Sequence, residues 1–117
     1  MPEANGYKSR SRQELDVYKS CLHVHDLPEI FHYWSDNKIR PLLKEFGFGS
    51  PHGMFELYLE RQCRRVTTRA LRFISIGAGN CDLEIKLAQR LKAAGHTRFV
   101  IDCLDLNPAM LERGRSA

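Results

Sequence analysis

Several features that would assign this chain to a membrane, a zinc site or a disulfide scaffold are missing from the sequence. No uninterrupted apolar run approaches the roughly 18 residues that a membrane span needs, and residues 1–12 lack the apolar stretch of a signal peptide. Four cysteines are present, but they are widely spaced and form no CxxC pair, and His23, His25 and His32 lack a ligand partner at metal spacing. We therefore expect a cytoplasmic protein with reduced thiols, no metal site and no membrane contact.

The amino-acid composition is that of one globular domain. At 117 residues, with 43% hydrophobic and 27% charged residues, the chain can fill a single core. The formal net charge is +4, and the excess of positive charge is partly local, in an arginine cluster: Arg61, Arg64, Arg65, Arg69 and Arg72. Nucleic-acid binding is one interpretation of this cluster, but a solvated helix face accounts for such clusters more often. No RNA- or DNA-binding motif accompanies it.

The first half of the chain carries several helix start signals. Ser11 and Glu14 have the spacing of a capping box, which predicts a helix from about Arg12 to Cys21. Asp26 followed by Pro28 predicts the start of a second helix, because proline in the first turn loses no needed hydrogen bond.

Two further helices are expected before residue 66. Ser35 or Asp36 is suited to cap a third helix, and Gly47 is suited to end it. Ser50 and Pro51 then open a fourth helix, which runs to the arginine-rich turn. The region before the first expected strand is therefore mainly helical.

From Leu71 the pattern changes to alternating strands and helices. Residues 73–76 form a short run with β-branched side chains that stops at glycines, as a buried parallel strand would. A helix, a second strand and a further helix are expected at 82–94, at 98–104 and from Pro108. This order predicts an α/β fold built on a right-handed βαβ unit with two parallel strands.

The turn Gly77-Ala78-Gly79 directly follows the first expected strand. Ligands of parallel sheets bind at the carboxyl ends of the strands, and glycines there let a ligand lie against the main chain. Dinucleotide-binding proteins and ordinary tight turns share such a GxG. A dinucleotide fingerprint, however, has a third glycine where this chain has Asp82, whose carboxylate would repel a pyrophosphate. Asp82 disfavours NAD, whereas S-adenosylmethionine (SAM) has no phosphate and carries a positive sulfonium.

Asp105 ends the second expected strand, which adjoins the glycine turn in this architecture. A carboxylate there can accept hydrogen bonds from two ribose hydroxyls. The other interpretation is a solvated aspartate that caps the helix starting at Asn107 and Pro108. Asp102 is a weaker candidate, because it lies within the strand and on its other face.

Two segments resemble the first two motifs of class I SAM-dependent methyltransferases: Phe73-Ile-Ser-Ile-Gly-Ala-Gly-Asn-Cys-Asp-Leu-Glu84 and Cys103-Leu-Asp-Leu-Asn-Pro-Ala-Met-Leu111. The resemblance implies a Rossmann-like sheet and a SAM site. It implies that the cofactor is lined by Gly77, Ala78 and Gly79, that Asp105 binds its ribose, and that Leu106 flanks its adenine.

Two positions depart from the family pattern. Ser75 stands where the family commonly has an acidic residue, and Cys81 replaces a third glycine. We expect Ser75 to hydrogen-bond the methionine end of SAM, directly or through water, and we expect weaker binding than with an acidic residue.

The resemblance also implies a division of the chain. Residues 1–10 would be a flexible N-terminus, 11–70 a helical lid and substrate-side region, and 71–117 the first half of the SAM-binding domain. The family sheet has more strands than the two found here, so we expect a fragment or truncated product of a longer methyltransferase that is inactive alone. Two bare strands should also leave one sheet face partly uncovered.

The leading functional hypothesis is SAM-dependent transfer of a methyl group to an unidentified small-molecule acceptor, with no identifiable catalytic base. A SAM- or nucleotide-binding module without catalysis is a second hypothesis. A basic protein that binds nucleic acid through its arginine cluster is a third. The sequence carries no signal for an oligomeric state.

Overall fold

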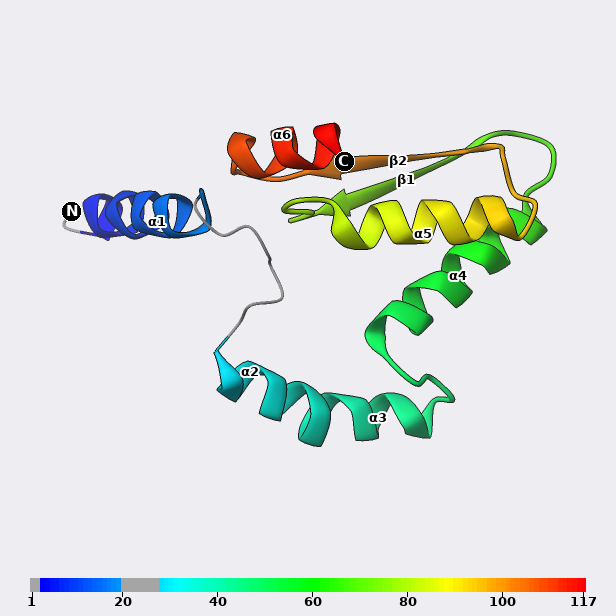
Figure 1. Cartoon of the computed structure of the whole chain (residues 1–117), viewed down its shortest axis with the longest axis horizontal. Coiled ribbons are helices and arrows are strands. Elements are labelled where there is room, and N and C mark those ends of the chain that lie inside the picture. Colours follow the sequence, from blue (N-terminus) through cyan, green and yellow to red (C-terminus); the bar gives the residue numbers. More distant parts are fainter. Residues whose placement is uncertain (1–2, 20–27) are drawn as a thin grey trace.

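The computed structural model of the chain describes residues 3–19 and 28–117 (Figure 1). Within these ranges the elements are α1 (Glu3–Lys19), α2 (Glu29–Trp34), the π-helical turn η1 (Ser35–Ile39), α3 (Arg40–Glu45), α4 (Pro51–Arg65), β1 (Leu71–Ile76), α5 (Asp82–Ala93), β2 (Phe99–Leu104) and α6 (Pro108–Ser116). None of the helices in the described ranges has the length and apolar character needed to cross a membrane.

The two strands form a parallel sheet, as the sequence predicts. β1 pairs with β2 in a register that runs from Leu71 opposite Phe99 to Ile76 opposite Leu104. α5 connects them, and the chain is therefore a mixed helix and strand protein compatible with an α/β fold.

The core lies on one side of this sheet. Burial alternates along β1, because successive side chains of a strand point to opposite faces. On the other face Ile74 and Ile76 are exposed, Ile76 to 86%. Beneath the covered face, α5 contributes the buried side chains of Leu87 and Leu91, and α4 packs against α5. The expectation of a partly bare sheet face is confirmed.

Local signals correctly locate the helix starts and ends in the second half of the chain. The Ser50 hydroxyl accepts a hydrogen bond of 3.1 Å from the Gly53 N–H at the start of α4. Gly95 has φ +91° after the last turn of α5, a left-handed conformation that glycine adopts without strain.

The predicted start of the first helix is wrong. α1 begins at Glu3, so Ser11 and Glu14 lie within the helix and form no capping box. The residues before Ser11 contain no proline after position 2, so nothing in the backbone prevents the helix from extending toward the N-terminus. The predicted end at Cys21 lies outside the described residues.

The predicted cap at Ser35 or Asp36 is also wrong, since α2 continues through η1 into α3. Ser35 has helical backbone angles, and Asp36 instead pairs with Arg40 one turn later, at 3.0 Å. Pro41, in the first turn of α3, has no N–H to donate, and the widened π turn before it lets the helix continue. The other expected start signal, Asp26, lies outside the described residues, but α2 does begin directly after Pro28.

Helices α2 and α3 lie apart from the sheet, as Figure 1 shows. Neither they nor η1 contain a buried residue. α1, by contrast, lies beyond the carboxyl ends of both strands and contacts α6. The N-terminal helix is therefore the one that lies next to the predicted ligand site.

Candidate functional site

The glycine turn after β1 has the backbone geometry that requires glycine. Gly77 and Gly79 have φ values of +76° and +57°, in the left-handed region. The N–H groups of Gly77 and Ala78 both donate to the carbonyl of Leu104, at 2.8 and 3.0 Å. The turn is thereby held against the end of β2.

Cys81 also has a left-handed backbone, with φ +62°. It is the position at which the family resemblance leads one to expect a third glycine. The backbone of the turn is therefore of a kind that glycine adopts freely, although this chain places a buried cysteine there.

Asp105 joins the two strand ends. One oxygen of its carboxylate, Oδ2, accepts a hydrogen bond of 2.8 Å from the Gly79 N–H, and the other, Oδ1, accepts one of 2.7 Å from the Asn107 N–H. Asn107 in turn caps α6 by accepting from the Ala109 N–H at 3.1 Å. The cap of α6 is therefore Asn107, and Asp105 instead links the glycine turn to the start of that helix, while each of its oxygens can accept a second hydrogen bond from a ligand.

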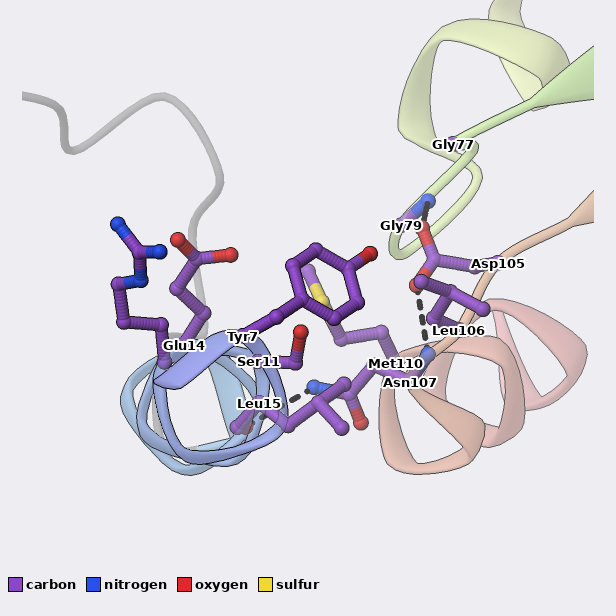
Figure 2. Close-up of a pocket in the computed structure, with 11 residues that line it drawn as sticks. Tyr7, Ser11, Glu14, Leu15, Gly77, Gly79, Asp105, Leu106, Asn107 and Met110 are labelled. Carbon is purple, nitrogen blue, oxygen red and sulfur yellow. Dashed lines mark hydrogen bonds between the residues drawn. The ribbon is translucent and has the colours of Figure 1, made fainter. Parts of the chain in front are cut away.

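A cavity of about 610 Å³ opens beside Asp105. Figure 2 shows the residues around it, with the Tyr7 ring pointing from α1 toward Asp105. The lining residues come from α1, from the glycine turn and from the start of α6: Tyr7, Arg10, Ser11, Glu14, Leu15, Gly77, Gly79, Asp105, Leu106, Asn107 and Met110. A cavity of this size holds a ligand as large as a nucleoside derivative.

Hydrogen bonds join α6 and its cap residue Asn107 to α1. The Asn107 Nδ2 group donates to the Leu15 carbonyl at 3.2 Å, and the Arg113 guanidinium donates to the Lys19 carbonyl at 2.9 Å. The same guanidinium donates to the Asn80 side chain at 3.1 Å. The glycine turn, α6 and α1 are therefore connected around one space.

Sequence reasoning found only part of the contribution of α1, because the expected lid began at residue 11. Its five lining residues have the spacing of one helical face: Tyr7, Arg10, Ser11, Glu14 and Leu15. This spacing could have been found only if the helix had been extended beyond Ser11 toward the N-terminus. Their mixed polar character gives no hydrophobic periodicity to reveal it.

The predicted cofactor residues are not all placed together. Gly77, Gly79, Asp105 and Leu106 line the cavity, and Leu106 is 84% exposed to it and to solvent. Ala78 is not among the lining residues, although it belongs to the turn. Ser75 hydrogen-bonds the carboxylate of Glu84 and lines a different cavity.

Two other aspartates, Asp82 and Asp102, lie outside the cavity. Asp82 is the first residue of α5, where its charge complements the helix dipole. Asp102 forms an ion pair with Arg72 across the strands. Neither aspartate is among the lining residues.

Cys81 is not an activated nucleophile. Burial raises the pKa of its thiol to about 12, and a hydrogen bond with Cys103 and the nearby charges of Glu84 and Asp105 act in the same direction. A thiol with this pKa stays protonated at neutral pH, and the protonated form does not attack electrophiles.

Much of the arginine cluster is engaged within the chain. Arg64 pairs with Glu60 at 2.7 Å, Arg72 pairs with Asp102, and the guanidinium of Arg61 lies 5.8 Å from the ring centroid of Tyr58. These contacts favour the solvated-surface interpretation over nucleic-acid binding.

In the part of the chain that the structure describes, no group of three or more His, Cys, Asp or Glu side chains is arranged to hold a metal ion. Comparison with protein-family models, with curated proteins and with solved structures found no match. The functional assignment therefore depends on the cavity itself and on the sequence resemblance.

Proposed function

We propose that this chain carries the SAM-binding βαβ unit of a Rossmann-like class I SAM-dependent methyltransferase and that it binds SAM in the cavity between α1 and the glycine turn. The observation that carries the proposal is the hydrogen bond of 2.8 Å between the Asp105 carboxylate and the Gly79 N–H. Because of this bond, the glycine turn after β1 and the acidic end of β2 border one cavity. SAM needs both features side by side, one for its methionine part and one for its ribose.

The charges around the cavity support a cofactor without phosphate. Asp105 and Glu14 contribute acidic side chains to the cavity lining, and Arg10 contributes a basic one. Asp82 occupies the first position of α5, where a dinucleotide would place its pyrophosphate. A ligand with a positive sulfonium suits this balance better than one with two phosphates does.

Each part of SAM has a neighbour in this arrangement. Asp105 would accept hydrogen bonds from ribose hydroxyls, and Leu106 and Met110 offer apolar surface to adenine. A Cβ at Gly77 would meet no atom within 4 Å, so the main chain there is open to the methionine part. The acceptor is proposed to be a small molecule, and alignment of acceptor, methyl carbon and sulfur would supply much of the rate.

Calorimetric titration of the chain with SAM and with its demethylated product tests the proposal. Both should bind, and binding should be lost in Asp105→Ala but kept in Asp102→Ala, which removes the same side chain outside the cavity. NADH should bind at least about tenfold more weakly than SAM, because its pyrophosphate would lie in a cavity lined by the acidic side chains of Asp105 and Glu14. Equal affinity for NADH and SAM, or full SAM affinity in Asp105→Ala, would contradict the proposed site.

A SAM-binding module without catalysis is the second candidate. The observation that favours it is that the described residues lining the cavity supply no histidine or lysine as a general base. SAM binding without release of the demethylated product, across a panel of amine, phenol and thiol acceptors, would support this candidate over the enzyme.

A further inference from the structure

The helical segment made of α2, η1 and α3 carries a large apolar surface that the rest of the described structure leaves exposed. We call residues 29–46 the α2–α3 segment. All of them lie in the described ranges, and the three helices contain no buried residue. Six large apolar residues of the segment are between 47% and 75% exposed: Ile30, Phe31, Trp34, Ile39, Leu42 and Phe46. Contiguous apolar surface of this kind marks an interaction site.

The π turn η1 brings the apolar side chains of α2 and α3 onto one face. A π turn holds one residue more than an α-helical turn, so the residues after it lie as if one position earlier. Counted in this way, Ile39 is 39 − 30 − 1 = 8 positions after Ile30, and Leu42 is 42 − 30 − 1 = 11 positions after it. With Trp34 at 34 − 30 = 4 positions, these spacings form a single helical stripe. Without the extra residue, Leu42 would lie about a quarter turn farther round the helix.

This helical segment needs a partner for its apolar stripe. Helices shorter than about 12–15 residues are marginal in water, and a helix only slightly longer, as here, still takes most of its stability from packing of its apolar face. Pro41 weakens the segment further, because it has no N–H to donate to the preceding turn.

The charges of the segment suit a second copy of itself. Residues 29–36 carry two acids and neither Lys nor Arg, whereas residues 37–45 carry three basic residues and one acid, so the formal charges of the two halves are −2 and 3 − 1 = +2. In an antiparallel pair, the acidic half of each copy lies beside the basic half of the other, and a parallel pair would place like charges together. A bilayer surface is a poorer match, because helices that lie on membranes carry an excess of Lys and Arg.

The apolar area is sufficient for a dimer. An aromatic side chain buries about 150–250 Å² and an aliphatic one somewhat less, so the six exposed side chains offer roughly 600 Å² in each copy. Two copies would bury roughly 1,200 Å² in total, which is the lower end of the range for stable protein interfaces.

We propose that two copies of this chain associate through the α2–α3 segment, as an antiparallel helix pair with the two apolar stripes facing each other. Both copies use the same residues, so the interface is closed by a two-fold axis and association stops at the dimer. Trp34 lies within the stripe and leaves water when the dimer forms.

The dimer is independent of the proposed SAM site. None of the residues of the α2–α3 segment lines the cavity beside Asp105. A monomeric variant should therefore bind SAM as the unaltered chain does, and Asp105→Ala should still form the dimer.

The test uses the whole chain. Sedimentation between about 1 and about 300 µM should show a reversible monomer–dimer equilibrium. Trp34 is the single tryptophan, so its fluorescence reports on the interface. The emission should shift to shorter wavelength as the dimer forms and should return on dilution.

Two variants locate the interface. Leu42→Glu places an unpaired charge in the stripe of each copy and should raise the dissociation constant of the dimer by at least about tenfold. His32→Glu adds a negative charge to the same segment, but His32 is exposed and lies two positions after Ile30, away from the stripe. This control should keep the dissociation constant within about threefold of the unaltered value.

Three results would overturn the inference. The first is a monomer with constant Trp34 emission over the whole concentration range. The second is a dimer that Leu42→Glu leaves unchanged, because that dimer would use another surface, such as the exposed side of the sheet. The third is a chain that stays monomeric but shifts its Trp34 emission with vesicles of phosphatidylcholine and phosphatidylserine, which would assign the stripe to a bilayer. If Leu42→Glu does not fold, the concentration dependence of Trp34 emission in the unaltered chain decides the question.

Discussion

The side-chain carboxylate of Asp105 accepts a hydrogen bond from the backbone N–H of Gly79, 26 positions earlier in the chain, at 2.8 Å. This contact closes the glycine turn of β1 onto the end of β2. The second oxygen of the same carboxylate accepts from the Asn107 N–H, at the start of α6. One side chain therefore organises the edge at which we propose that SAM binds.

Asp105→Ala should lower stability as well as SAM affinity. Two backbone N–H groups lose their acceptor, and the free energy of unfolding should fall by about 1–3 kcal/mol. Urea denaturation followed by circular dichroism measures this change. Asp102→Ala is the control, because its ion pair with the exposed Arg72 should contribute less than about 1 kcal/mol. Equal stability losses in the two variants would contradict the role given to Asp105.

Glycine-to-alanine substitutions should have opposite effects at two helical positions. A Cβ at Gly114 in α6 would lie 2.7 Å from the Asn80 carbonyl oxygen and 3.0 Å from the Cys81 sulfur, so alanine must push α6 away from the glycine turn. We expect Gly114→Ala to lower the free energy of unfolding by about 1–3 kcal/mol.

Gly6→Ala in α1 is the matched control for this effect. A Cβ at Gly6 would meet no atom within 4 Å, and alanine should raise the free energy of unfolding by about 0.5–1 kcal/mol through helix propensity. Thermal unfolding of both variants shows whether each substitution raises or lowers stability. Stabilisation by Gly114→Ala would show that α6 does not pack against the turn.

Glu14→Gln should distinguish SAM from its neutral demethylated product. Glu14 lines the proposed SAM cavity from α1, and its negative charge should favour the positive sulfonium. We expect affinity for SAM to fall by about twofold to fivefold while affinity for the demethylated product changes less, because the charge is exposed and partly screened.

Asp16→Asn is the control for Glu14→Gln. Asp16 lies on the same helix but not among the lining residues of the cavity. Calorimetry with both ligands should show an unchanged affinity ratio in this variant. If the ratio of SAM affinity to product affinity is unchanged in Glu14→Gln as well, the sulfonium does not lie near α1.

The buried Cys81 thiol should make stability depend on pH in the alkaline range. Its pKa is raised from 9.0 to about 12 in the folded protein, so between these values the folded state binds more protons than the unfolded state. Its contribution is fully present below pH 9 and is lost as the pH rises toward 12. The free energy of unfolding of the unaltered protein should therefore fall more steeply over this range than that of Cys81→Ala.

Denaturation at several pH values between 8.5 and about 11 measures this difference. Alkylation gives an independent check, since Cys81 should react with iodoacetamide at pH 8 only after the chain is unfolded in urea. Parallel pH profiles in the two proteins would contradict the raised pKa.

The βαβ unit could be predicted from the sequence because its signals are local. The β-branched run before Gly77, the glycine after α5 and the proline that opens α6 each act through a few neighbouring residues. The same holds for Ser50, whose hydroxyl bonds an amide three positions later. The structure predicted from such local signals forms in the folded protein because no distant contact competes for the same backbone groups.

Local signals predicted the wrong helix start where two starts were compatible with the local sequence. The Ser11 capping box and the start of α1 at Glu3 are both compatible with local chemistry, and the longer helix is the one observed. Ser35 and Asp36 likewise have cap-forming side chains but lie inside a continuous helical segment. A capping side chain predicts that a helix can begin at a residue, and it does not show that the preceding residues are unable to be helical.

The sequence by itself thus determined the parallel strand pair, the glycine turn and the acidic strand end, which are the features that direct attention to SAM. Only the tertiary structure placed α1 over that site, through a hydrogen bond from Asn107 to Leu15 across 92 positions of the chain. It also placed Ser75 against Glu84 and outside the cavity beside Asp105, where we expected it to meet the methionine end of SAM. These contacts join residues far apart in sequence or on facing elements, and no local pattern of residue types encodes which side chains meet there.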